Sequence, residues 1–351
     1  MVTDLSERQK MILMLVVRDY TESAQPIGSR HLVEHYRLGL SSATIRNEMV
    51  ALTELGYLRQ PHTSAGRIPS EAGYRYFVSH LMHQTDLPEA VQHTISHQFY
   101  QARPEVDQWM TLAASVLAQQ SQAISMITAP HAEQARFKHV ELISTQGRQV
   151  LMVLVMQGGE VSQQILTLAE PVMQIRLSEV AVRINQGFQG HSVDEISSMS
   201  AHSADALETD ISGLIAQDMR RADALVGGDL YYDGLTNVFA EPEFNTNDEA
   251  RRTLRLFEER STLRGMLSRA MQNSGVGGVQ VLIGSEGTWE ELRQCSMVLA
   301  RYGVAGRITG TLGILGPMRM AYTKAIPTVR YVAGLLSELV NDTFAGEEAD
   351  D

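Results

Sequence analysis

The most informative side chains of this chain lie between residues 43 and 50, where their spacing suits contact with DNA bases. At the roughly 100° per residue of a helix, one side of this stretch would hold Ile45, Met49 and Leu52. The opposite side would carry Ala43, Asn47 and Val50, with Arg46 on its flank. A helix face that is only solvated would carry more Lys and Glu. Asn pairs well with adenine and Arg with guanine, so Asn47 and Arg46 are the predicted base contacts.

The preceding segments predict the elements that would position these residues. Ser6 to Gln9 form a capping box that opens a first helix, and residues 26–29 open a second helix. Residues 37–40 form a turn, after which Ser41 or Ser42 caps the third helix. The order of helix, helix, turn and helix is typical of a helix-turn-helix DNA-binding motif.

A short β-hairpin is predicted directly after the third helix. Its strands would be residues 58–60 and 67–68, joined by a tip at residues 62–66. A fourth helix, capped by Ser70, would follow. The hairpin adds a wing to the motif, so residues 1–85 are predicted to form a winged helix-turn-helix domain.

The same motif predicts which side chains would hold the DNA backbone. Polar side chains and free amides at a helix start suit phosphate oxygens, whereas wing side chains suit the backbone or the minor groove. The predicted DNA-binding residues are therefore Ser29, Arg30, Ser42, Ala43, Thr44, Arg46, Asn47, His62, Thr63 and Arg67.

Charge is distributed unevenly along the chain. The formal net charge of −12 would by itself argue against nucleic-acid binding. However, residues 1–83 hold nine Lys and Arg against eight Asp and Glu, whereas the remaining residues hold 20 against 33. This asymmetry is typical of a DNA-binding head on an acidic body. The weakly basic head favours a dimer with modest phosphate contacts over a non-specific DNA coat.

Length and composition exclude several classes of protein. With 351 residues, two to three domains are expected. No apolar run approaches the roughly 18 residues of a membrane span, and the first residues lack the apolar stretch of a signal peptide. A single cysteine, Cys295, excludes an internal disulfide framework and fits a reducing cytosol. We therefore expect a cytoplasmic protein with no membrane partner, associated with the nucleoid when bound to DNA.

The rest of the chain predicts an α+β architecture with an insertion. Residues 88–123 have helical patterns, and residues 320–343 should form a closing helix. Strands are predicted at 140–143, 150–156 and 161–168, and residues 279–283, 296–302 and 307–314 should be further sheet strands or a mixture of helix and strand. These would form one antiparallel sheet with helices on one face. The mainly helical segment between the two groups of strands would be a domain inserted into another.

Features that could suggest other chemistry have simpler explanations. His31 and His35 are four residues apart but lack a third metal ligand, so they are expected to be solvated helix residues near DNA. The glycine-rich residues 274–278 precede a strand and lack the Lys of a phosphate-binding loop. Cys295 lies in an apolar segment and is expected to be a buried structural thiol. We therefore predict no catalytic residues, no metal site and no cofactor, and the protein is not expected to be an enzyme.

Two stretches at opposite ends of the chain resemble a known family. The segments 43–49 and 60–69 resemble the bacterial heat-inducible transcription repressor family HrcA, and so do residues 316–322 and 324–327. The resemblance thus covers essentially the whole chain. Two positions depart from the family pattern, Thr53 in place of a usual Glu and Gly287 in place of a usual Asn, and neither lies on the predicted DNA face.

The resemblance implies a domain organisation and partners that the residues alone do not give. It implies a GAF-like α+β domain formed by residues 88–178 and 273–345. It also implies that the insertion, residues 179–272, serves dimerisation. The regulated genes would be chaperone operons, and a chaperonin would keep the repressor folded and active.

Taken together, these patterns predict a sequence-specific, homodimeric transcription repressor. Two winged heads related by a two-fold axis require an inverted-repeat operator. Two alternatives remain open. One is a ligand-gated regulator whose GAF-like domain binds a small effector, and the other is an enzyme that carries a winged-helix interaction module.

Overall fold

The amino-terminal helices begin at the capping residues that the sequence predicts. In the first, the Ser6 hydroxyl accepts a hydrogen bond from the Gln9 amide, and the Gln9 side chain accepts one from the Ser6 amide. Ser41 and Ser70 cap later helices in the same way, each accepting a hydrogen bond from a backbone amide three residues on. These caps satisfy amides that would otherwise lack partners, and they fix where each helix starts.

In the computed structural model of the protein, the chain forms two compact units. The structure describes residues 5–62, 65–82, 86–102, 105–132, 134–157, 161–200, 205–224, 229–244, 255, 257–271, 274–284 and 292–344. The first unit comprises Met1–Ala129, Asp229–Tyr302 and Thr311–Asp342, and the second comprises Pro130–Gly228, Gly303–Gly310 and Thr343–Asp351.

Residues 5–82, which we call the head, contain helices followed by a short antiparallel ribbon. The elements are α1 (Glu7–Ser23), α2 (Ser29–Tyr36), α3 (Ser42–Glu54), β1 (Leu58–Arg59), β2 (Ile68–Pro69), α4 (Glu71–Tyr76) and the π-helix η1 (Phe77–Leu81). Strands β1 and β2 pair antiparallel, and Ile27 forms a further bridge with Arg67. The buried side chains of α1, α2 and α3, which include Ile12, Leu32 and Ile45, form the core of the head.

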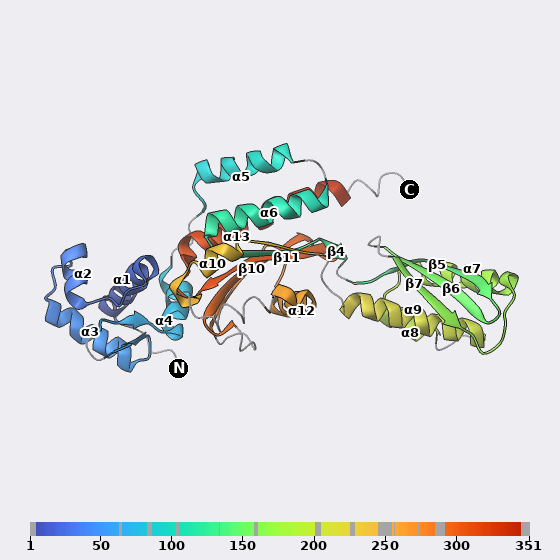
Figure 1. Cartoon of the computed structure of the whole chain (residues 1–351), viewed down its shortest axis with the longest axis horizontal. Helices are drawn as coiled ribbons and strands as arrows, with labels where there is room; N and C mark the ends of the chain where they lie inside the picture. The colour runs from blue at the N-terminus through green and yellow to red at the C-terminus, as the bar shows by residue number, and fades with distance from the viewer. Residues whose placement is uncertain are drawn as a thin grey trace. The chain divides into compact units, whose positions relative to one another are not determined.

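The rest of the first unit, which we call the body, is built on a twisted sheet with the strand order β8-β3-β11-β10-β9. Its elements are α5 (Glu89–Gln101), α6 (Val106–Ser121), β3 (Ile124–Thr128), β8 (Leu230–Asp233), α10 (Leu235–Phe239), the 3-10 helix η2 (Pro242–Phe244), α12 (Arg260–Met271), β9 (Val279–Ile283), β10 (Cys295–Val304), β11 (Ile308–Pro317) and α13 (Tyr322–Phe344). Figure 1 shows α6 and α13 on one side of this sheet and α12 on the other. The buried side chains of α12 pack against those of β3 and β10.

The second unit has a separate three-stranded sheet with its own core. Its elements are β4 (His131–Ala132), β5 (Phe137–Gln146), β6 (Gln149–Met156), β7 (Val161–Thr167), α7 (Gln174–Phe188), α8 (Val193–Ser200) and α9 (Ala206–Ala224). β5, β6 and β7 form an antiparallel meander, and one face of it packs against the helices around Phe137, Met152 and Leu154. β4 pairs apart from this meander, with Ile308 and Thr309 at the start of β11.

The structure confirms an α+β fold but places the predicted boundaries differently. Strands β5–β7 were predicted to extend the sheet of the GAF-like domain (88–178 and 273–345), yet they form their own sheet. Conversely β8 and α12, within the predicted insertion 179–272, belong to the body. The body sheet also has helices on both faces, not on one. Alternating apolar residues identify a strand, but a strand's partners depend on which helices cover it, and that information is not local.

Two further observations bear on the predicted class. None of the helices in the described part of the chain is long and apolar enough to cross a membrane. Cys295 is buried at the start of β10, as expected for a structural thiol.

Candidate nucleic-acid interface

One face of α3 is exposed and carries the predicted base-contacting residues. Ile45, Met49 and Leu52 are buried in the core of the head. Ala43, Arg46 and Asn47 are exposed. Among the described residues, the side chains of Arg46 and Asn47 have no hydrogen-bond or ion-pair partner, so their donors and acceptors are available to a ligand.

The electrostatics of this face favour an anionic partner. Glu48 is the carboxylate nearest in sequence to Arg46 and Asn47, and its Oε1 lies 3.4 Å from Nη1 of Arg8 on α1. Its charge is therefore partly balanced from within the head. The Arg46 guanidinium, in contrast, is exposed without a carboxylate partner in the described structure, which suits contact with DNA.

The fold brings two predicted phosphate contacts together at the starts of α2 and α3. The Ser29 and Ser42 hydroxyl oxygens are 2.9 Å apart although the residues are 13 positions apart in sequence. Thr44, a third predicted phosphate contact, also takes part in the cap, because its amide and hydroxyl both bond to the Ser41 hydroxyl. Arg30 is exposed one residue beyond Ser29. The starts of two helices thus meet at one place, and that of α2 has no side-chain cap, an arrangement that suits a phosphate group.

Arg67 anchors the wing to the rest of the head. Its amide and carbonyl both bond to the backbone of Ile27, at 2.8 and 2.9 Å. Its Nε donates to the Thr53 hydroxyl on α3 over 3.0 Å, and its side chain is half-buried. The role predicted for Arg67, contact with the DNA backbone or minor groove, is thus joined by a structural one that sequence reasoning missed. The sequence had marked Thr53 only as a departure from the family pattern.

The tip of the wing is closed by hydrogen bonds within it. The Ala65 amide donates to the His62 carbonyl, and the Gln60 side chain donates to the Ala65 carbonyl. His62 is exposed and remains available to a partner. Thr63, another predicted contact, lies outside the described residues.

A buried carboxylate holds α2 against α1, and the sequence interpretation did not identify it. Asp19 is 7% exposed, and its side chain accepts hydrogen bonds from His31 Nε2 at 2.9 Å and from the Tyr36 hydroxyl. Burial, with the hydrogen bond to Asp19 and its charge, raises the pKa of Tyr36 to about 12. His31, expected to be a solvated residue near DNA, is exposed and also has this internal partner. The available signal was an acid on the apolar side of the first helix.

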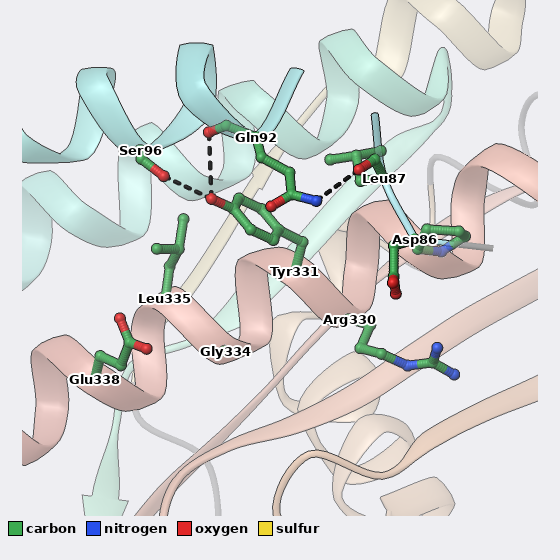
Figure 2. A pocket seen from close by; sticks show the side chains of 10 residues that line it. Asp86, Leu87, Gln92, Ser96, Arg330, Tyr331, Gly334, Leu335 and Glu338 are labelled. Atoms are coloured by element: carbon green, nitrogen blue, oxygen red, sulfur yellow. Dashed lines mark hydrogen bonds between the residues drawn. The ribbon is translucent and has the colours of Figure 1, made fainter. Parts of the chain in front are cut away.

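A pocket of about 450 Å³ lies away from α3, between α5 and α13 of the body. Figure 2 shows Tyr331 at its centre, where the hydroxyl bonds to Ser96 and to the Gln92 carbonyl. Asp86, Arg330 and Glu338 also line it. The charged groups at its margin and the apolar surface near Leu335 suit a small amphipathic molecule.

Comparison with known proteins places the chain in a family. Residues 107–326 match the model of the HrcA protein C-terminal domain. The chain belongs to the HrcA family. A relative from Roseiflexus castenholzii is 44% identical over 99% of this chain and 98% of its own length. Relatives from Chloroflexus aurantiacus and Thermomicrobium roseum are 40% and 38% identical over at least 95% of both chains. All three are named heat-inducible transcription repressor HrcA.

A solved structure supports the fold of this HrcA family member. A crystal structure of a hypothetical protein aligns with a TM-score of 0.60 and 23% identity, and covers 97% of this chain and 100% of its own. At this identity the likeness concerns the fold alone.

Proposed function

We propose that this protein is a heat-inducible transcription repressor that binds operator DNA through a winged helix-turn-helix in its head. The observation that carries the proposal is the exposed face of α3, where Arg46 and Asn47 project without internal partners among the described residues. The relatives that match nearly the whole chain carry the name of a repressor and not of an enzyme.

The geometry of the head suggests how it would bind DNA. α3 would lie in the major groove, with Arg46 toward a guanine and Asn47 toward an adenine. The joined helix starts at Ser29 and Ser42 would hold a phosphate, with Arg30 beside them. The wing would place His62 and Thr63 against the backbone or the minor groove. The base contacts would specify sequence, and the phosphate contacts would fix the register.

Replacing Arg46 by Ala is expected to weaken binding to the specific operator by about 1–3 kcal/mol and to relax base preference at one position of each half-site. The reason is the loss of a bidentate contact with a guanine. Fluorescence anisotropy with labelled duplexes would measure both effects.

Arg18→Ala is the matched control, since Arg18 is an exposed arginine on α1 and its loss removes the same charge from the head. Binding of Arg46→Ala with the affinity and base preference of the wild type would contradict the proposed docking.

We also propose that the second unit joins two copies of the chain, and that the body adopts a GAF-like fold. The face of the β5–β7 sheet opposite its helices carries six apolar side chains, which we call the apolar sheet face: Ile143, Leu151, Val153, Val155, Val161 and Ile165. Ile165 is 64% exposed and Val161 is 55% exposed. The same face also carries the ion pair of His139 with Glu141. Exposed apolar side chains gathered on one sheet face favour a protein partner, and a second copy would give the two-fold symmetry that an inverted repeat requires.

Heat and a chaperonin would act on this repressor through its stability. A protein of marginal stability loses its active dimer on warming, and a chaperonin that refolds it would restore repression of chaperone operons. We expect operator binding to fall after heat treatment and to recover when chaperonin and ATP are added. An operator-binding assay on heat-treated protein would measure this, and no recovery would count against a chaperonin partner.

The pocket between α5 and α13 favours one alternative, a regulator gated by a small effector. A thermal-shift screen of metabolites against the whole protein would separate the two functions. A metabolite that raises the melting temperature and changes operator affinity would support a regulator gated by an effector. No response to any metabolite would support a repressor that responds to heat through its own stability.

A further inference from the structure

The side chain of Arg319 connects the body to the end of a helix in the head. Arg319 lies between β11 and α13 and is 11% exposed. Its Nε donates to Glu243 over 2.6 Å, and its Nη2 bonds to Glu241. Its Nη1 donates to the carbonyl of Thr21 over 3.3 Å. A single guanidinium therefore joins three segments that are far apart in sequence.

The charges at this contact explain why an arginine occupies it. Thr21 lies in the last turn of α1, where backbone carbonyls lack helical partners and the helix carries a partial negative charge. Two carboxylates and this carbonyl surround the guanidinium. Burial alone would lower the pKa of Arg319, but the hydrogen bonds and charges of Glu243 and Glu241 outweigh it and raise the pKa. The planar guanidinium donates in several directions at once, which an ammonium group cannot do with the same geometry.

A second contact between head and body lies at α4. The rings of Tyr74 on α4 and Tyr322 at the start of α13 have centroids 6.1 Å apart. The Tyr322 hydroxyl is held in turn by a hydrogen bond to the Met318 carbonyl and another with the Ser296 hydroxyl. A Cβ on Gly284, at the end of β9, would lie 2.7 Å from the Glu71 carboxyl carbon. The backbone of the body thus lies directly against α4.

The hydroxyl of Tyr74 is buried at this contact without a hydrogen-bond partner among the described residues. Tyr74 is 2% exposed, and burial raises its pKa well above the usual range. Buried polar groups are normally paired, so an unpaired hydroxyl weakens the contact. The ring contact at α4 thus leaves one polar group unsatisfied, whereas all three nitrogens of the Arg319 guanidinium donate hydrogen bonds. We call these contacts of Arg319 and Tyr74 together the joint between head and body.

We propose that Arg319 is a positioning residue for operator binding, which holds the head in one orientation on the body. The proposal rests on the proposed function, because it concerns two heads that bind two half-sites. The second head of a dimer increases affinity for the operator only when both heads can bind their half-sites at the same time, at the spacing that the DNA presents. Fixing the head to the body sets this spacing without any contact between Arg319 and DNA.

The first experiment measures head orientation without DNA. Spin labels would be attached through Glu34→Cys on α2 and Glu338→Cys on α13, both exposed positions, in chains diluted with an excess of unlabelled protein. Cys295 is buried and should stay unlabelled. We expect a narrow distance distribution that Arg319→Ala broadens and Arg319→Lys broadens less. Arg330→Ala, which removes a charge from α13 outside the joint, should leave it narrow. An unchanged distribution in Arg319→Ala would overturn the proposal.

The second experiment measures how operator affinity depends on the spacing between half-sites. It uses the duplex sequence that the wild type enriches from a random pool. The wild type should bind about 100-fold or more weakly when about five base pairs, half a helical turn, are added between the half-sites. In Arg319→Ala this difference should shrink to about tenfold or less, with affinity for a single half-site unchanged. If Arg319→Ala lost equal affinity for duplexes with one and with two half-sites, the head itself would be damaged and the positioning role would be overturned. If the labels show the broadening but the wild type binds no duplex, the joint stands and the proposed function fails.

Discussion

Replacing Ile165 by Asp is expected to convert the dimer into monomers and to reduce affinity for an inverted-repeat operator by about 10²–10⁴-fold. Ile165 lies on β7, in a row with Leu151 and Ile143 across the three strands. A carboxylate in the centre of an apolar interface would be desolvated without a partner, which opposes association. Because the second head then no longer binds at high effective concentration, operator binding falls to that of a single head. Sedimentation velocity and anisotropy would measure the two effects.

The matched control for this change is Val182→Asp on α7. Val182 is 52% exposed, so the same charge is added to another exposed apolar position of the second unit. It should leave the dimer intact. If Val182→Asp dissociates the dimer and Ile165→Asp does not, the interface lies on α7 and not on the apolar sheet face. Val182→Asp should unfold at the temperature of the wild type, and Ile165→Asp should remain folded as a monomer, because both side chains are exposed.

Replacing Gly66 by Ala is expected to lower the stability of the head by about 1–3 kcal/mol and to weaken operator binding. A Cβ on Gly66 would lie 2.3 Å from the backbone oxygen of Ile27, and backbone atoms cannot move aside as a flexible side chain can. The wing would shift away from the segment that leads into α2, and the paired hydrogen bonds between Ile27 and Arg67 would be lost. Urea unfolding and anisotropy would measure the change.

Gly28→Ala is the control for this second change. Gly28 is next to Ile27, has an ordinary negative φ, and has no atom within 4 Å of where its Cβ would be. Gly28 is the N-cap of α2, where Ala is less favourable than Gly, so Gly28→Ala should lose about 1 kcal/mol or less of stability and keep the wing anchored. Equal stability of Gly66→Ala and Gly28→Ala would show that the wing is not anchored at Ile27.

The local features of the head could be predicted from the sequence because short-range chemistry determines them. Ser6, Ser41 and Ser70 cap helices by bonding to amides three residues away, so a window of four residues contains the signal. The apolar spacing of Ile45, Met49 and Leu52 likewise identifies the buried side of α3, and thereby the side that is exposed.

The contacts that join distant segments could not be predicted in this way. The pairing of Ser29 with Ser42, the anchoring of Arg67 on Thr53 and the bonds of Arg319 all depend on packing between elements. The formation of a separate sheet by β5–β7 likewise depends on packing between elements. Each strand alternates as a strand should, but the helices that cover it follow later in the chain. Sequence periodicity gives the faces of elements and not the pairs of faces that meet.

The most direct test of the central claim, that α3 reads an operator, is selection of bound duplexes from a random pool. The wild type should enrich an inverted repeat with two equivalent half-sites. The variant Asn47→Ala should enrich the same repeat with base preference lost at one symmetric pair of positions. A pool without an enriched sequence, or an identical motif for both proteins, would contradict the assignment of the exposed α3 face to DNA.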